Sequence, residues 1–116
     1  MNNDLNERLF NFAINCLKFI KTFPDSTEFK VIKYQLAKSS TSSGANYEES
    51  QAGSSKADFN NKVRISLREM RESNYWLRII DGIRDCRINY EELGILIRES
   101  NELKNILGSI VNKTSN

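Results

Sequence analysis

Hydrophobic residues recur every three or four positions through most of this chain, which is the spacing of one face of an α-helix. Four segments show this pattern, at approximately residues 4–23, 27–53, 55–81 and 90–112. Each segment carries polar residues on its other faces, so each predicts an amphipathic helix that buries one side. Short connections favour antiparallel neighbours, and we predict an all-α, antiparallel up-down four-helix bundle formed by one domain, residues 1–116.

Turn-forming residues separate the first three segments. Pro24 follows the first segment and cannot continue a helix, and Ser26 or Thr27 suits the N-cap of the second. Gly53 suits the end of the second segment, and the serines at 54–55 can cap the third. These residues predict short, well-defined connections.

The second segment contains a run of small residues, SSTSSGA at 39–45, which local rules assign to a flexible linker. We predict a regular helix there instead. Small side chains let two helix backbones approach closely, and tertiary packing often outweighs the modest propensity cost. The sequence Tyr47-Glu48-Glu49 resumes helical composition directly afterwards. The run should therefore be a contact surface between two helices.

Composition supports a soluble helical protein. Charged residues make up 28% of the 116 residues and hydrophobic residues 39%, with a single proline. No apolar run approaches the roughly 20 residues that a membrane span requires. The N-terminal MNNDLNERLF carries acidic residues where a signal peptide would be basic. We expect a cytoplasmic protein that does not enter a membrane.

The residue types argue against catalysis. Cys16 and Cys86 lack CxxC spacing, and the chain has no histidine, so we expect two buried free thiols. Without histidine, a di-iron bundle site lacks its ligands and a serine or cysteine nucleophile lacks its usual base. Four carboxylates could hold a metal or form a charged polar layer, and we favour the layer: Glu48, Glu49, Glu69 and Glu72. We therefore predict no enzymatic activity, metal or cofactor.

Two blocks resemble a known family: QLAKSSTSSGANYEES at 35–50 and SKADFNNKVRISLREMRESNYWL at 55–77. They are similar to the four-helix-bundle family named after the 23S ribosomal RNA intervening-sequence protein. Two positions depart from the family pattern, since Lys38 replaces the usual arginine and Arg68 stands where lysine is common. The matching positions are Gln35, Leu36, Ser39, Ser42, Asn46, Glu49, Asp58, Phe59, Glu69, Glu72, Tyr75, Trp76 and Leu77.

The resemblance implies an antiparallel four-helix bundle that assembles as a ring-shaped homopentamer. The family name records that its genes lie within insertions in ribosomal RNA genes, and it describes no activity. A related accessory protein of diversity-generating retroelements has the same fold, and it binds nucleic acid and a reverse transcriptase through a basic surface. The resemblance therefore implies self-association, with RNA, DNA or another protein as further partners.

Three polar or aromatic motif positions allow two interpretations each. Asn46 and Glu49 lie three residues apart on one helical face, which should approach the start of the third helix. They could contact a ligand, but we favour a structural role, either capping or bridging to Lys62 or Arg64 inside the oligomer. Trp76 could stack on a base, but we favour an anchor in the core or an interface.

A row of cations follows one side of the third helix. Arg64, Arg68, Arg71 and Arg78 recur at spacings of four, three and seven, and Tyr75 lies among them. Arginines with an interleaved aromatic suit contact with a phosphate backbone. The alternative is a solvated or inter-subunit face in which the arginines pair with carboxylates. The net charge is +2, so a pentamer would pool about +10.

Two hypotheses remain open. In the first, a non-catalytic oligomeric bundle binds nucleic acid through the third helix, assisted by Lys18, Lys21, Lys30 and Lys33. In the second, the protein is an interaction scaffold that binds another protein and no nucleic acid.

Overall fold

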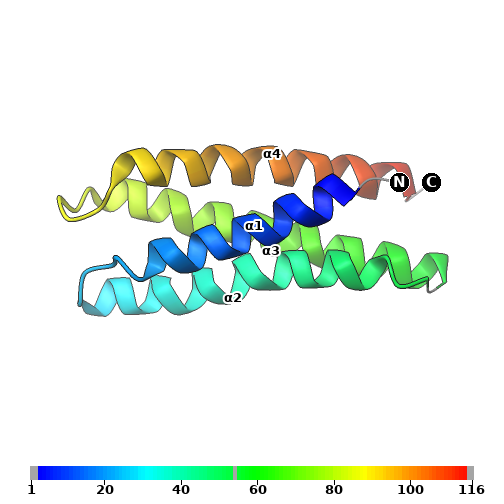
Figure 1. The fold of residues 1–116 in the computed structure, drawn as a ribbon, viewed down its shortest axis with the longest axis horizontal. Coiled ribbons are helices and arrows are strands. Elements are labelled where there is room, and N and C mark those ends of the chain that lie inside the picture. The colour runs from blue at the N-terminus through cyan, green and yellow to red at the C-terminus, as the bar shows by residue number, and fades with distance from the viewer. Residues whose placement is uncertain (1–2, 54, 115–116) are drawn as a thin grey trace.

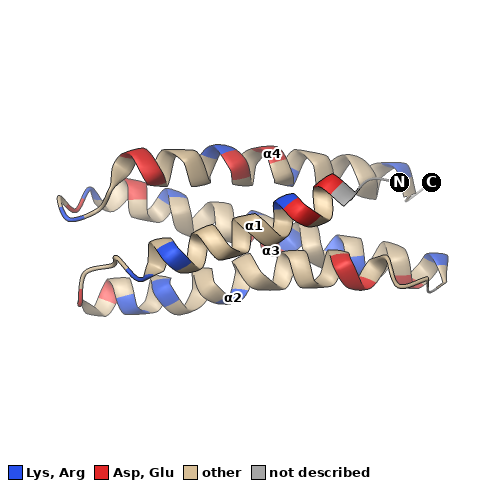
Figure 2. Ribbon diagram, in the orientation of Figure 1, with Lys and Arg blue, Asp and Glu red and all other residues tan. Residues whose placement is uncertain are grey.

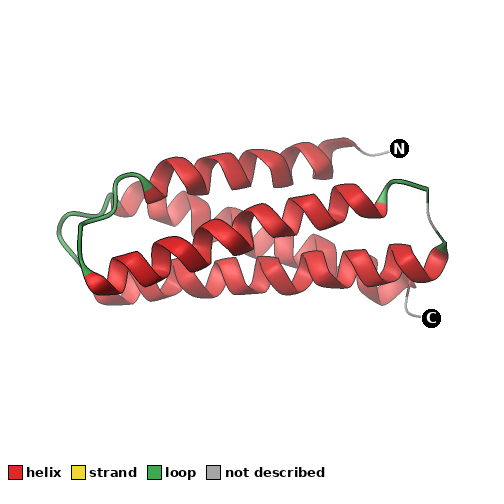
Figure 3. Cartoon of the chain, turned by 90° about the horizontal axis from the view of Figure 1, so that it is seen from below, coloured by secondary structure: helices red, strands yellow, loops and turns green. Residues whose placement is uncertain are grey.

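The computed structural model describes residues 3–53 and 55–114, and this part of the chain consists of helices and short connections. The helices are α1 (Asn3–Ile20), α2 (Thr27–Ser50), α3 (Lys56–Ile83) and α4 (Tyr90–Thr114). Consecutive helices run in opposite directions, and the ends of α1 and α4 that face the chain termini lie at the same end (Figure 1). Figure 3 shows the loops after α1 and α3 together at the opposite end. The predicted all-α up-down four-helix bundle is confirmed.

The four helices form a square in cross-section. α1 and α3 each pack against both α2 and α4, so α1 lies diagonal to α3. The molecule measures 47 × 21 × 20 Å. The apolar faces predicted by the helical spacing meet at the centre, where the largest fully buried side chains are Phe12, Phe19, Phe29, Leu9, Leu36, Met70, Leu77, Ile80, Leu93, Leu103, Leu107 and Val63.

The small-residue run of α2 is regular helix, as predicted. Residues 39–47 carry no charge, so this part of α2 is tan in Figure 2. Ser39, Ser40 and Ser43 are fully buried. On a neighbouring face, a Cβ added to Gly44 would lie 3.3 Å from the Cβ of Leu9 in α1. Because these side chains are so small, α2 packs closely against both α3 and α1, and α2 with α3 forms the most extensive helix pair.

Helix α1 ends at Ile20, three residues before the predicted end at residue 23. The amide of Thr22 donates to the carbonyl of Phe19, and that of Phe23 donates to Ile20, so the backbone tightens into a turn. The residue before a proline is disfavoured in helical geometry, which accounts for the early end before Pro24. Phe23 leaves the helix but still packs against the core.

The end of α2 and the start of α3 lie within a few residues of their predicted positions. α2 ends at Ser50, before the predicted residue 53. The amides of Gln51 and Ala52 donate to the carbonyls of Glu48 and Glu49, three residues earlier, where an α-helix would use a spacing of four. Gly53 then adopts a positive φ of 83°, which glycine tolerates best. The Ser55 side chain accepts a hydrogen bond from the amide of Asp58 as the N-cap of α3. Ser54 lies outside the described residues.

The remaining helix ends also differ slightly from the sequence prediction. Ser26 caps α2, as one of the two predicted choices. α3 continues through Gly82 to Ile83, beyond the predicted end at 81, and stops where Arg84 adopts a left-handed φ of 57°. α4 reaches Thr114, two residues beyond the predicted 112. Glycine lowers helix propensity only modestly, so helix packing can carry α3 across it.

The loop between α3 and α4 is held by one acidic residue. Asp85 accepts hydrogen bonds from the backbone amide and the guanidinium of Arg87. These bonds lower the pKa of Asp85 to about 2. Cys86 between them is exposed, so the prediction of two buried thiols is wrong for this residue. The loop turns its side chain outward, whereas Cys16 on the inner face of α1 is fully buried.

None of the helices in the described part of the chain is long and apolar enough to cross a membrane.

Candidate nucleic-acid interface

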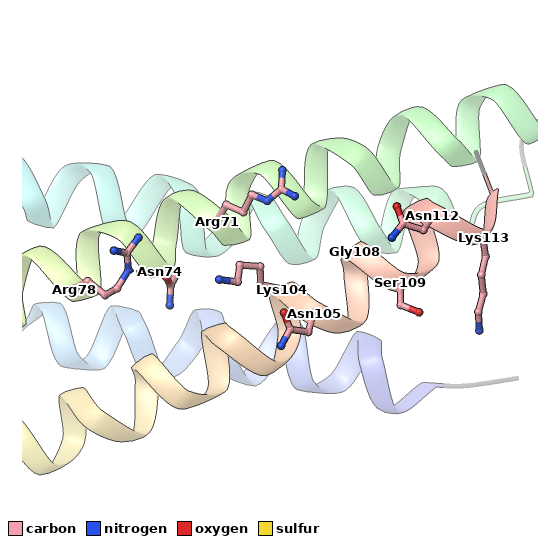
Figure 4. A pocket seen from close by; sticks show the side chains of 9 residues that line it. All are labelled: Arg71, Asn74, Arg78, Lys104, Asn105, Gly108, Ser109, Asn112 and Lys113. Carbon is pink, nitrogen blue, oxygen red and sulfur yellow. Dashed lines mark hydrogen bonds between the residues drawn. The ribbon is translucent and has the colours of Figure 1, made fainter. Parts of the chain in front are cut away.

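A groove of about 840 Å³ runs between α3 and α4. Cations, amides, a hydroxyl and a glycine line it, and Figure 4 shows the α3 side chains across from those of α4. The lining residues are Arg71, Asn74, Arg78, Lys104, Asn105, Gly108, Ser109, Asn112 and Lys113. A concave surface with this lining suits an anionic ligand.

Helix α3 contributes one wall through Arg71, Asn74 and Arg78, which follow the helical spacing of three and four. Nε of Arg78 donates to Oδ1 of Asn74 at 2.9 Å. Nδ2 of Asn74 in turn donates to Oγ of Ser100 at 2.8 Å and to Oδ1 of Asn101 at 3.1 Å. Asn74 is only 2% exposed, so a buried amide joins the two walls and holds the Arg78 guanidinium in place.

Helix α4 contributes the other wall, including Lys104 near the middle of the groove and Lys113 near its end (Figure 4). Sequence reasoning missed this wall because it considered only carboxylates as partners of the α3 arginines and assigned no cation of α4 to the site. A signal was present, since the polar residues at 104, 105, 109, 112 and 113 recur with helical spacing. That spacing alone could not say that they face Arg71 and Arg78.

The predicted arginine row does lie on one exposed side of α3, and its members are all exposed. Two of them, Arg71 and Arg78, line the groove. Arg68 does not line the groove, and it lies within electrostatic reach of Glu69, as does Lys38 of α2. Arg64 is exposed one turn before Arg68 and does not line the groove.

None of the four predicted lysines lines the α3–α4 groove, and Lys30 and Lys33 are exposed on α2. Lys18 is in the last turn of α1, and Lys21 follows that helix. Both are exposed, and α1 is diagonal to α3 in the bundle. The structure therefore does not bring them together with Arg71 and Arg78.

The family-motif residues of α2 mostly make structural contacts. Oγ of Ser39 lies 2.8 Å from Oγ of Ser73 in α3. Nδ2 of Asn46 donates to the carbonyl and the hydroxyl of Ser42 one turn earlier, within α2 itself. The role expected for Asn46 inside an oligomer stays a prediction. Glu49 is exposed near the end of α2, and Gln35 is half-buried. The asparagine bond stays local because Ser42 is four residues away on the same face.

The motif residues of α3 divide between the surface and the core edge. Glu72 accepts a hydrogen bond from Nε1 of Trp76 at 3.3 Å, and the Trp76 ring packs against the core. Burial raises the pKa of Glu69, and the nearby charge of Glu72 raises it further, while Arg68 and Lys38 oppose the shift. The predicted anchoring role of Trp76 fits this half-buried position.

The described residues contain no group of three histidine, cysteine or acidic side chains that could hold a metal ion. Burial raises the pKa of the Cys16 thiol to about 12, although a hydrogen bond to Ser40 opposes the shift, so this thiol is a poor nucleophile. What the α3–α4 groove can do is bind anionic oxygen atoms with guanidinium, ammonium and amide donors.

Comparisons with known proteins agree with the architecture. The family model described as 23S rRNA-intervening sequence protein matches residues 1–109. A crystal structure from the S23 ribosomal protein family of Bacteroides thetaiotaomicron VPI-5482 is similar, with a TM-score of 0.80 and 32% identity. The match covers 92% of this chain and 97% of that one, which is described as a protein of unknown function. No curated protein matches the chain. The chain belongs to the 23S rRNA-intervening sequence protein family.

Proposed function

We propose that this protein binds nucleic acid without catalysing a reaction, and that the α3–α4 groove holds the phosphate backbone. One observation carries the proposal: Arg71, Arg78, Lys104 and Lys113 line a single groove whose other lining residues are amides, a hydroxyl and a glycine. Cations gathered in a concave surface raise the local positive potential far above what a net charge of +2 suggests. Neither the family nor the similar crystal structure is described by a catalytic activity.

The geometry supports phosphate contact in particular. Arg78 uses Nε to bond Asn74, which leaves the two terminal nitrogens of its guanidinium for phosphate oxygens. Lys104 extends from the opposite wall toward Asn74 and Arg78 (Figure 4). A chain of phosphates along the groove would meet cations from both helices. Backbone contacts of this kind give affinity with little sequence preference.

The test is binding of labelled RNA and DNA at several salt concentrations. The groove variant Arg71→Gln/Lys104→Gln is compared with Lys18→Gln/Lys21→Gln, which removes the same charge from α1 and its following turn. We expect affinity to fall linearly with salt on logarithmic axes. The steepness of this line counts the phosphate contacts, at about 0.7 to 0.9 for each contact. The groove variant loses two cations, so its line should be less steep by about 1.4 to 1.8.

The variant Lys18→Gln/Lys21→Gln is the matched control and should bind nucleic acid like the unmodified protein. Equal weakening by both variants would show that binding follows net charge and not the groove. Absence of binding by the unmodified protein at low salt would refute nucleic-acid binding altogether. Circular dichroism checks that both variants keep their helices.

A second proposal, self-association, is supported by the opposite side of the bundle. Phe10 is 61% exposed on α1, and Leu17 is exposed two turns later. Together with Ile14 they line an apolar groove of about 340 Å³ between α1 and α2, beside Gly44 and other small residues of α2. An exposed apolar surface of this kind is typical of a protein–protein contact. A homo-oligomer, as the pentamer implied by the resemblance, would cover it.

Light-scattering mass tests self-association directly, because one chain has a mass of 13.4 kDa. We expect the unmodified protein to have the mass of an oligomer. The variant Phe10→Asp/Leu17→Asp should have the mass of one chain and should keep its helices. A monomeric unmodified protein would refute self-association. The apolar groove would then favour the alternative function, a scaffold that binds another protein. The cytoplasmic location expected from the sequence stays a prediction.

A further inference from the structure

The groove has an exposed aromatic ring beside it. Tyr75 is 47% exposed and lies on α3 between the groove residues Arg71 and Arg78, four residues after one and three before the other. The guanidinium carbon of Arg78 lies 5.8 Å from the centre of the Tyr75 ring. Arg78 therefore touches both the groove and the ring, which places Tyr75 at the rim.

The Tyr75 ring is held in a defined orientation. It meets the Trp76 ring edge to face, with centroids 5.2 Å apart and planes at 76°. Trp76 is itself packed against the core and bonded to Glu72. Arg78 is fixed by the buried Asn74. A surface aromatic ring supported on two sides loses little conformational entropy when a flat ligand stacks on it.

The shape of the site distinguishes between kinds of nucleic acid. Proteins read a duplex with an element that protrudes into one of its grooves. Here the cations line a hollow of about 840 Å³ in a bundle only 21 × 20 Å across, so a duplex could touch only the rim. A single strand is narrow enough to lie in the hollow. A basic groove combined with an aromatic platform is the usual arrangement for binding single strands.

We infer that the nucleic acid bound by this groove is single-stranded, with its phosphates between Arg71, Arg78 and Lys104 and one base stacked on Tyr75. This inference rests on the proposed function of the groove. It adds the class of nucleic acid and a residue that contacts a base.

The test compares a labelled single-stranded oligonucleotide with a duplex of the same sequence. Tyr75→Leu removes the aromatic ring and keeps an apolar side chain, while Tyr75→Trp keeps a stacking surface. Tyr34→Leu is the matched control, because Tyr34 is an exposed tyrosine on α2, away from the groove. Denaturation in urea checks that each variant remains folded.

We expect tighter binding of the single strand than of the duplex. Tyr75→Leu should weaken single-strand binding about 5- to 150-fold, the loss expected for one stacked base. Its salt dependence should stay the same, because the phosphate contacts remain. Tyr75→Trp and Tyr34→Leu should bind like the unmodified protein.

Equal affinity for duplex and single strand would overturn the inference, as would a Tyr75→Leu effect below about twofold or one matched by Tyr34→Leu. In each of these outcomes salt-dependent binding through Arg71 and Lys104 would survive, and so would the proposed function. Absence of salt-dependent binding to either nucleic acid would instead refute both.

Discussion

Ser43 of α2 and Ser66 of α3 exchange hydrogen bonds across the most extensive helix pair of the bundle. Oγ of Ser43 donates to the carbonyl of Ser66 at 2.8 Å, and Oγ of Ser66 donates to the carbonyl of Ser43 at 2.7 Å. Both side chains are fully buried. Each hydroxyl thus reaches the backbone of the other helix, which is possible only where the two backbones come close together. The buried serines thus form a packing surface with satisfied polar groups.

Ser43→Val should destabilise the bundle by about 1–3 kcal/mol, because the branched side chain has no space and the bond to the Ser66 carbonyl is lost. Urea denaturation measures this change. Ala45→Val is the control, since Ala45 is exposed two residues along the same helix. Its effect should stay within about 0.5 kcal/mol. Equal stability of Ser43→Val and the unmodified protein would contradict the close packing.

The two cysteines should react at very different rates. Cys16 is fully buried and its pKa is raised to about 12, whereas Cys86 is exposed in a loop. At pH 8 a thiol reagent should label one cysteine in the native protein and the second only after denaturation, because the thiolate is the reactive form. Cys86→Ser should abolish the native reaction, and Cys16→Ser should preserve it. Rapid labelling of folded Cys86→Ser would contradict the burial of Cys16.

Arg8 should stabilise the contact between α1 and α4. Its guanidinium donates to both carboxylate oxygens of Glu99, at 3.0 and 2.7 Å, and lies 3.1 Å from Glu102. The bond to Glu99 raises the pKa of Arg8, so this guanidinium stays charged at any ordinary pH. Arg8→Lys cannot form the two-pronged contact and should cost about 0.5–1 kcal/mol.

A double-mutant cycle with Arg8→Met and Glu99→Gln measures the coupling energy between the two side chains. Both are about one third exposed, so the coupling should decrease in high salt. A coupling energy of zero at low salt would show that the ion pair does not contribute to stability.

Glu69→Gln should stabilise the protein at neutral pH. Burial raises the pKa of Glu69 in the folded state, so its ionised form is less favourable there than in the unfolded chain. The stability linked to protonated Glu69 is fully present below its ordinary pKa of 4.5. This stability is lost as the pH rises through the raised pKa of the folded protein. The gain from Glu69→Gln should therefore be largest near pH 7 and disappear below about pH 4.

Urea denaturation of both proteins at several pH values tests this dependence. The difference between the two proteins isolates Glu69 from the other carboxylates that titrate in the same range. A glutamine variant that is less stable at pH 7 would mean that attraction to Arg68 and Lys38 outweighs burial.

The local pattern of residues was sufficient for the helices and the fold. Apolar spacing of three and four identified all four helices, and the caps at Ser26 and Ser55 followed from their side-chain chemistry. The serine-rich run was correctly predicted as helix because small side chains have a packing use that local propensity ignores. The exact ends were less predictable, since packing carried α3 through Gly82.

The candidate site depended on how the helices are rotated and paired. Spacing along α3 placed Arg64, Arg68, Arg71 and Arg78 on one side, but only contact with α4 selected Arg71 and Arg78 for a groove. Lys104 joined them because α4 packs beside α3, while Lys18 and Lys21 were left on α1. Periodicity reports which residues share a face of one helix. Which faces of two helices meet is decided by the packing of the whole core, and that packing created the basic groove.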